Sequence, residues 1–152
     1  MKFAIIMILL YFYLPFSLLA QNNDLNKEPR FEVFKQYYRN SNVAKRNKNY
    51  SKAVQQAQLA LIVGNMIFGE NDYRTAKLHN HIGSIYHTKG DSKQAITHYK
   101  KSILIYLKNY QKNRSELAKV YNNLGVAYNF LGEYDSALTY YKKSLDIMFN
   151  KR

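Results

Sequence analysis

Residues 76–102 read AKLHNHIGSIYHTKGDSKQAITHYKKS and residues 118–144 read AKVYNNLGVAYNFLGEYDSALTYYKKS, so the two stretches align without a gap. Over the 35 positions that begin at residue 76 and at residue 118, 13 are identical at an offset of 42 residues. The sequence therefore contains an internal repeat, and a repeat of this length predicts similar units that stack on one another.

Each copy has the pattern of two helices joined by a tight turn. Ile82 and Tyr86 lie at helical spacing on the first helix, and Gly83 between them allows close approach of a neighbouring helix. Gly90, like Gly132 in the second copy, falls where a helix end needs left-handed backbone. The predicted second helix carries a stripe at spacings of four and three, formed by Ala95, Tyr99 and Ser102.

The same offset carried backwards gives a weaker first unit over residues 34–75. Its second helix keeps the small stripe, but Ser41 stands where the next copy has Gly83, and neither glycine of the later copies is present. End repeats are usually atypical because one face meets water. The sequence thus predicts an all-α domain at 31–152 with repeats at 34–75, 76–117 and 118–152. The six expected helices cover residues 31–47, 50–67, 73–88, 92–110, 115–131 and 134–149.

The pattern resembles the tetratricopeptide repeat, and the copy with Gly125, Tyr128, Gly132, Ala137 and Tyr141 matches best. The 42-residue period is similar to the long variety found in kinesin light chains and in exported bacterial repeat proteins. The resemblance implies a right-handed α-solenoid of three helix-turn-helix units that acts as a non-catalytic scaffold. It also implies that the first helices line a concave groove that binds an extended peptide or protein.

The expected groove is basic and rich in amides, and its repeated lysines favour an acidic ligand. An alternative for the asparagines is that they belong to the repeat pattern and pair with neighbouring helices. The candidate peptide-binding residues are Lys35, Tyr38, Arg39, Asn42, Lys45, Lys77, Asn80, His81, Ser84, His87, Lys119, Asn122, Asn123, Val126 and Asn129.

Composition and motifs argue against other classes of function. The chain has no cysteine, which excludes disulfides and thiolate metal sites, and its four histidines have no metal-ligand spacing. There is no glycine-rich phosphate loop and no nucleophile motif, so neither catalysis nor a cofactor is expected. The net charge of +13 is spread singly and in pairs, as on solvated helix faces, and does not by itself indicate nucleic-acid binding.

The N-terminus has the layout of an export signal. Lys2 precedes the apolar residues 3–14, and Ala20 stands before a polar lead-in at 21–30, so residues 1–20 are expected to be a cleaved signal peptide. An uncleaved membrane anchor over residues 3–20 is the alternative. The expected location is periplasmic or extracellular, or membrane-anchored in the second case.

The last predicted helix has more apolar side chains than one neighbour can cover. A solenoid normally ends with a polar outer face. We therefore expect this edge to be covered by a second copy, by another partner or by residues lost from a longer ancestor. A second hypothesis for the function is a sensory or assembly segment of an exported signalling system that acts by oligomerisation. The edge residues are Leu138, Tyr140, Ile147, Met148 and Phe149, with Tyr141 and Leu145 on the same helix.

Overall fold

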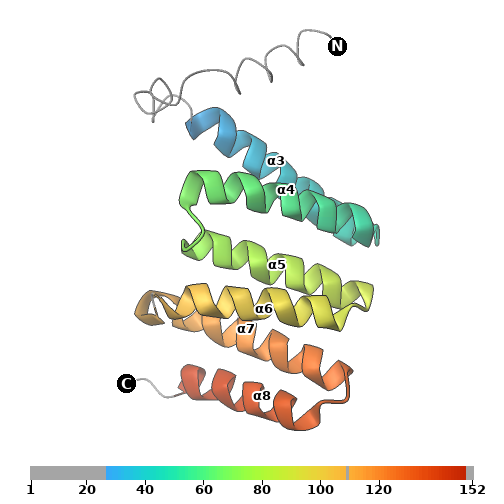
Figure 1. Ribbon diagram of the computed structural model, residues 1–152, viewed down its shortest axis with the longest axis vertical. Helices are drawn as coiled ribbons and strands as arrows, with labels where there is room; N and C mark the ends of the chain where they lie inside the picture. The colour runs from blue at the N-terminus through green and yellow to red at the C-terminus, as the bar shows by residue number, and fades with distance from the viewer. Residues whose placement is uncertain (1–26, 109, 150–152) are drawn as a thin grey trace.

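The computed structural model describes residues 27–108 and 110–149, which form six α-helices stacked along one long axis (Figure 1). No strand occurs in these two ranges, so the predicted all-α helical-repeat solenoid is confirmed. The predicted signal at 1–20 and residues 21–26 of the lead-in lie outside the described residues. The helices are α3 (Lys27–Arg46), α4 (Tyr50–Phe68), α5 (Tyr73–Lys89), α6 (Ser92–Leu107), α7 (Tyr110–Phe130) and α8 (Tyr134–Phe149).

Two helices begin earlier than the sequence predicts. α3 starts at Lys27 and not at residue 31, because Pro29 lies in the first turn, where its missing N–H costs no helical hydrogen bond. α7 starts at Tyr110 and not at residue 115, since the polar run before it contains neither glycine nor proline. Among the described helices, none has the length and apolarity that a membrane crossing requires.

The helix ends have the expected chemistry. The side chains of Asn49, Asp72 and Asp91 each accept a hydrogen bond from a backbone N–H in the first turn of α4, α5 and α6. Gly90 (φ 93°) and Gly132 (φ 77°) adopt positive φ after α5 and α7, as predicted. Lys48 adopts positive φ after α3, at 58°, although a side chain disfavours this backbone conformation.

Within each of the last two hairpins the helices approach at one small residue. In the second hairpin this is Gly83, where a Cβ atom would lie only 2.7 Å from the ring of Tyr99. Gly125 has the same relation to Tyr141 in the third hairpin. In the first hairpin Ser41 and the small Ala57 occupy the aligned positions, and the Ser41 hydroxyl donates to the Ala53 carbonyl at 2.9 Å.

In the second and third hairpins, a buried serine hydroxyl on the second helix also bonds to the backbone of the first helix. Ser102 donates to the carbonyl of Ala76 at 2.8 Å, and Ser144 donates to the carbonyl of Ala118 at 2.7 Å. Both serines replace the alanine usual in the repeat pattern, and both are buried. The hydrogen bond satisfies each hydroxyl, so the substitution is compatible with a buried interface.

The hairpins stack mainly through the second helix of one hairpin and the first helix of the next. α5 packs on both α4 and α6, and α7 packs on α6 and also contacts α5 directly. In the described part, α6 and α8 make no comparable contact with each other. The first helices α3, α5 and α7 are therefore the inner layer of the stack.

Candidate functional site

Hydrogen bonds join the inner helices of the first and second hairpins. The hydroxyl of Ser41 lies 2.9 Å from Nε2 of His81, and the ring of Tyr38 contacts the same imidazole with centroids 5.1 Å apart. One turn further along, Nζ of Lys45 donates to the hydroxyl of Ser84 at 2.7 Å. Four of the predicted groove residues thus contact one another across the two hairpins.

The asparagines of α5 and α7 make an analogous contact. Nδ2 of Asn123 donates to Oδ1 of Asn80 at 3.0 Å, and both side chains are half-buried. The pair therefore lies between neighbouring helices, as the alternative for these asparagines predicted. Asn122 and Asn129 are instead exposed on α7.

Burial keeps the imidazoles near the inner layer neutral. Burial, with a smaller contribution from Lys45, lowers the pKa of His81 to about 4. Burial also lowers the pKa of Lys45 itself. His87 is less enclosed; burial again lowers its pKa, Nδ1 lies 3.2 Å from the hydroxyl of Ser92, and its ring packs edge-on against Phe130.

A pair of histidines that was not predicted lies inside the second hairpin. Nδ1 of His79 is 3.1 Å from Nδ1 of His98, and Tyr86 stacks on His98. The pKa of each imidazole is lowered to about 4. Burial is the larger cause, and nearby charged groups, among them Lys101, are the smaller one. In the third hairpin the aligned positions hold Tyr121 and Tyr140, which also stack. The repeat alignment was the signal that could have revealed the pair, because His79 and His98 align with two aromatic residues, Tyr121 and Tyr140, at the offset of 42 residues.

The remaining groove candidates have local partners. Lys77 lies over the ring of Tyr73 at 5.4 Å, and Lys119 pairs with Glu116 at 3.3 Å one turn earlier on the same helix. Lys35 is half-buried over the ring of Phe31 at 4.8 Å and pairs with Glu32. Asn42 is half-buried, and its amide donates to the Tyr38 carbonyl at 2.9 Å. The candidates exposed on the inner helices also include Tyr38, Arg39, Val126 and Asn129.

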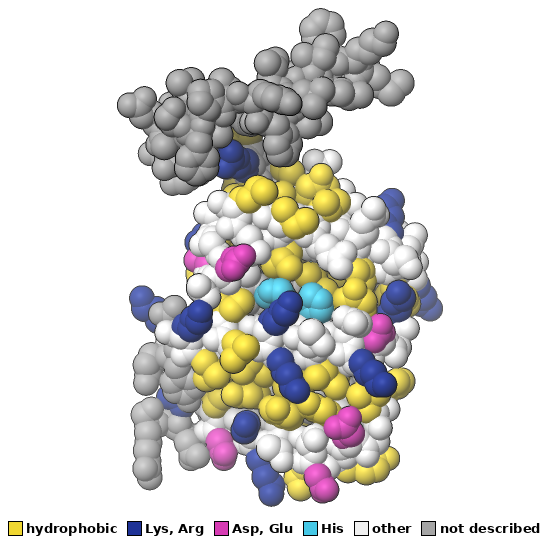
Figure 2. Space-filling view, in the orientation of Figure 1, with side chains coloured by type: hydrophobic (Ala, Val, Ile, Leu, Met, Phe, Trp, Pro, Cys, Tyr) yellow, Lys and Arg dark blue, Asp and Glu magenta, His cyan; other side chains and the backbone are white. Residues whose placement is uncertain are grey.

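Basic side chains do not form one patch on the face that Figure 2 displays. Lys and Arg residues stand singly there, among hydrophobic and uncharged side chains. No group of three or more potential metal-ligating side chains occurs within residues 27–108 and 110–149. The charge is therefore distributed on this face, as the spacing in the sequence predicts.

The far end of the stack is apolar. Leu138, Met148 and Phe149 are 52%, 59% and 74% exposed. Ile147 is half-buried, and its carbonyl accepts a hydrogen bond from Nη2 of Arg114 at 3.2 Å. Tyr140 is different from the other predicted edge residues, because it stacks on Tyr128 of α7 with centroids 5.4 Å apart and lies inside the hairpin.

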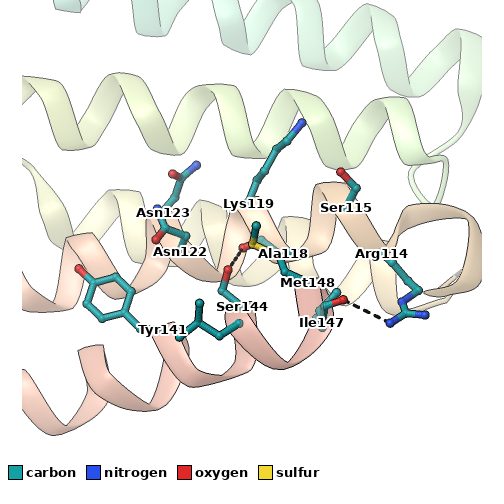
Figure 3. Close-up of a pocket in the computed structure, with 11 residues that line it drawn as sticks. Arg114, Ser115, Ala118, Lys119, Asn122, Asn123, Tyr141, Ser144, Ile147 and Met148 are labelled. Carbon is teal, nitrogen blue, oxygen red and sulfur yellow. Dashed lines mark hydrogen bonds between the residues drawn. The ribbon is translucent and has the colours of Figure 1, made fainter. Parts of the chain in front are cut away.

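Between α7 and α8 this end is hollowed, with a volume of about 850 Å³ (Figure 3). Figure 3 shows the residues of α7 on one side and those of α8 on the other. The sequence predicted only residues of α8 at this edge, but residues of α7 also line the hollow. The lining residues are Arg114, Ser115, Ala118, Lys119, Asn122, Asn123, Tyr141, Ser144, Leu145, Ile147 and Met148.

Solved structures with a similar fold were found by comparison. BtubC (BKLC) from P. vanneervenii superposes with a TM-score of 0.72 at 20% sequence identity, over 78% of this chain and 48% of that chain. This chain thus spans about half of BtubC. The TPR domain of FLU from Arabidopsis superposes with a TM-score of 0.71 at 17% identity, over 81% of this chain and 100% of that domain. These likenesses show a shared fold.

Sequence comparison gives the family. No curated protein matches the sequence significantly. The profile described as Tetratricopeptide repeat matches residues 36–108 and residues 74–148. Since these matches together cover most of the described helices, the chain belongs to the tetratricopeptide repeat family, whose members generally mediate protein–protein interaction.

Proposed function

We propose that this chain is a non-catalytic scaffold that binds an extended, acidic segment of another protein along the inner helices α3, α5 and α7. The observation that carries the proposal is the position of the exposed cations on these helices. Lys77 and Lys119 occupy aligned positions on α5 and α7, and within the described part their cation–π and ion-pair contacts are with their own helix. Surface pairs of this kind are weak, so both ammonium groups can turn to a ligand carboxylate at little cost.

Hydrogen bonds between the hairpins support a smaller set of proposed ligand contacts. Asn80 and Asn123 are bonded to each other, and His81 and Ser84 are bonded to α3. These four hold the hairpins together and leave the outward side chains for the ligand. The proposed contacts are therefore Tyr38, Arg39, Lys77, Lys119 and Asn129, all exposed on the inner helices.

A binding assay with a designed probe tests this proposal. The probe is a fluorescein-labelled ten-residue peptide of alternating Glu and Val, titrated with the full chain and followed by fluorescence anisotropy. The test variant is R39E/K77E, and the matched control is K93E/K142E, which makes the same change of charge at exposed positions on α6 and α8.

We expect binding to be lost in R39E/K77E and kept in K93E/K142E, because only the first pair lies on the inner helices. Equal weakening by both variants would show that the probe responds to overall charge. Unchanged binding by R39E/K77E would place the peptide elsewhere. Either result would overturn the proposed site.

A further inference from the structure

The hollow between α7 and α8 has an internal counterpart that is filled. At an offset of 42 residues its α8 lining aligns with residues of α6 that α7 covers. Ile103 and Tyr106 of α6 are 7% and 0% exposed, whereas Leu145 and Met148 at the aligned positions of α8 are 52% and 59% exposed. All four side chains are large and mainly apolar. The difference in exposure therefore comes from the helix that lies on one surface and not on the other.

The packing of α7 on the filled surface shows which side chains a surface of this kind, here called the seat, can accept. α7 presents Leu117, Val120 and Leu124 at helical spacings of three and four, and all three are fully buried. Together with α6 residues they form a single core cluster. A surface shaped for α7-like packing thus recurs at the end of the stack, open to solvent.

We propose that the hollow between α7 and α8 binds an amphipathic α-helix of another protein, oriented on α7 as α7 is oriented on α5. This site adjoins the inner-helix surface assigned above to an extended ligand, and Lys119 borders both. The occupant would carry apolar side chains at the spacing of Leu117, Val120 and Leu124. Its burial would cover Leu145 and Met148, which are now exposed members of the lining.

A polar contact sets the register of the docked helix. Position 38 of α3 contacts position 81 of α5, and position 80 of α5 bonds to position 123 of α7. Asn122 is the next member of the series 38, 80 and 122, and it lines the hollow. Its carboxamide is exposed and would accept a hydrogen bond from an amide, imidazole or hydroxyl donor of the occupant, as Asn80 does from Asn123.

The charge at the rim adds a further requirement. Arg114 and Lys119 line the hollow, and no carboxylate is among the lining residues. Both cations lie in the N-terminal half of α7, so they would face the N-terminal half of a helix docked in the same direction. Acidic residues are favoured in that part of any helix by its dipole. The occupant is therefore an amphipathic helix with an acidic first half.

A second copy of this chain fits the seat poorly. Head-to-tail stacking would bring α3 onto the hollow, and α3 has Gln36 and Asn40 at the positions aligned with Val120 and Leu124. Both are exposed, and the Asn40 amide donates to Gln56 at 3.3 Å. Burying such amides in an apolar seat without partners is costly.

The first hairpin also differs from the last in the surface around α3. A shallow pocket there is lined largely by amide side chains, those of Asn40, Asn47, Asn49 and Gln56. The outer surface of the first hairpin thus combines these amides with the exposed apolar side chains of Phe31, Val33 and Val43, whereas the exposed α8 side chains that line the hollow are Leu145 and Met148. This difference favours a helix of another protein as the occupant of the hollow.

The probe for this site is a fluorescein-labelled peptide with the sequence of residues 110–130 and the substitutions Lys112→Glu and Arg114→Glu, so that it carries the apolar face that the seat is inferred to accept and has an acidic first half. The control peptide has Val120→Gln and Leu124→Asn, which gives it the amides of α3. Both are titrated with the full chain by fluorescence anisotropy, and helix formation is followed by circular dichroism. The test variant of the protein is L145D, and the control variant is L104D.

L104D is a matched control because Leu104 is 63% exposed on α6, at the position aligned with Asp146 of α8. We expect the residue 110–130 peptide to bind as a helix, and L145D to weaken it by at least about tenfold, since a carboxylate would be desolvated in the seat. L104D should bind as the unchanged chain does. N122A should weaken binding by roughly threefold to tenfold, as expected for one hydrogen bond.

Several results would overturn the inference. One is the absence of binding by the residue 110–130 peptide, and another is equal binding by the control peptide. Equal effects of L145D and L104D would place the peptide elsewhere. Light scattering provides a separate test: a full chain that self-associates through a contact abolished by L145D alone would make the occupant a second copy and not another protein.

Discussion

The two glycine contacts inside the hairpins allow a sharp test of how the ends of the stack differ from its centre. A Cβ at Gly83 would lie 2.7 Å from both Cδ1 and Cε1 of Tyr99 and 3.2 Å from the Ala95 carbonyl oxygen. A Cβ at Gly125 would meet Tyr141 and the Ala137 carbonyl at the same three distances. The variants G83A and G125A therefore introduce the same local clash in two different surroundings.

The surroundings decide the expected cost. Replacing glycine by alanine inside a helix stabilises it by about 1 kcal/mol, whereas overpacking a rigid core costs about 1–3 kcal/mol. Tyr99 is 2% exposed and belongs to the main core cluster, so its ring cannot move without disturbing α7. Tyr141 is half-buried and borders the hollow, so its ring can turn toward the solvent. We expect G83A to lose about 1–2 kcal/mol and G125A to be close to neutral.

Urea unfolding measured by circular dichroism at a helix-sensitive wavelength gives the difference. Both variants should keep the slope of the free energy of unfolding against urea, so the midpoints can be compared directly. A loss in G125A as large as that in G83A would refute the reasoning. It would mean that the backbone contact at the carbonyl, identical at both sites, sets the cost and that the open end gives Tyr141 no freedom.

Three further predictions concern single sites. The neutral pair His79 and His98 should make the protein acid-sensitive: both pKa values are about 4 in the folded chain against 6.5 unfolded, so the unfolded chain binds more protons in this window. The free energy of unfolding should fall as pH drops from 6.5 toward 4, by about 1–2 kcal/mol per imidazole at pH 5 after allowance for solvent screening. H79Y/H98Y should make a urea-midpoint profile less steep over that range, leaving the part that comes from His81 and His87, whose pKa values are also lowered. K48G should raise thermal stability by about 1 kcal/mol, because glycine removes the strain of a side chain at φ 58°, and an unchanged melting temperature would contradict this. Y106F should be neutral or stabilising by up to about 1 kcal/mol in urea unfolding, because the buried Tyr106 hydroxyl has no hydrogen-bond partner among the described residues; a marked loss would reveal one.

Repetition made most of the fold predictable from the sequence. A gapless alignment transfers the structural constraints of one hairpin to the next, so Gly90 and Gly132 could be placed at helix ends before their positive φ values were known. Helix starts were less predictable, because a helix can extend into polar residues that carry no repeat signal. The expected start at residue 31 lies after Pro29, although a proline in the first turn is compatible with a helix.

The site was only partly predictable, because exposure depends on neighbouring hairpins and not on the repeat itself. Asn80 and Asn122 occupy aligned positions and have a similar sequence environment, yet Asn80 accepts a hydrogen bond from α7 and Asn122 faces the open hollow. Tyr140 looked like an edge residue because it is apolar and near the end, but it stacks on Tyr128. Such differences arise from the place of a hairpin in the stack.

The different residue sizes at the hairpin contacts limit how this chain could be recombined. Each hairpin contact is a matched pair of residues. In the first hairpin both residues are small, Ser41 and Ala57, whereas in the second the ring of Tyr99 packs over the bare backbone of Gly83. A crossover inside a hairpin would join Ser41 to a tyrosine-bearing helix, or leave Gly83 opposite an alanine and a void between them. A crossover in the loop between Phe68 and Tyr73 keeps both pairs whole. Exchange of whole hairpins therefore preserves these contacts, whereas exchange of single helices breaks them.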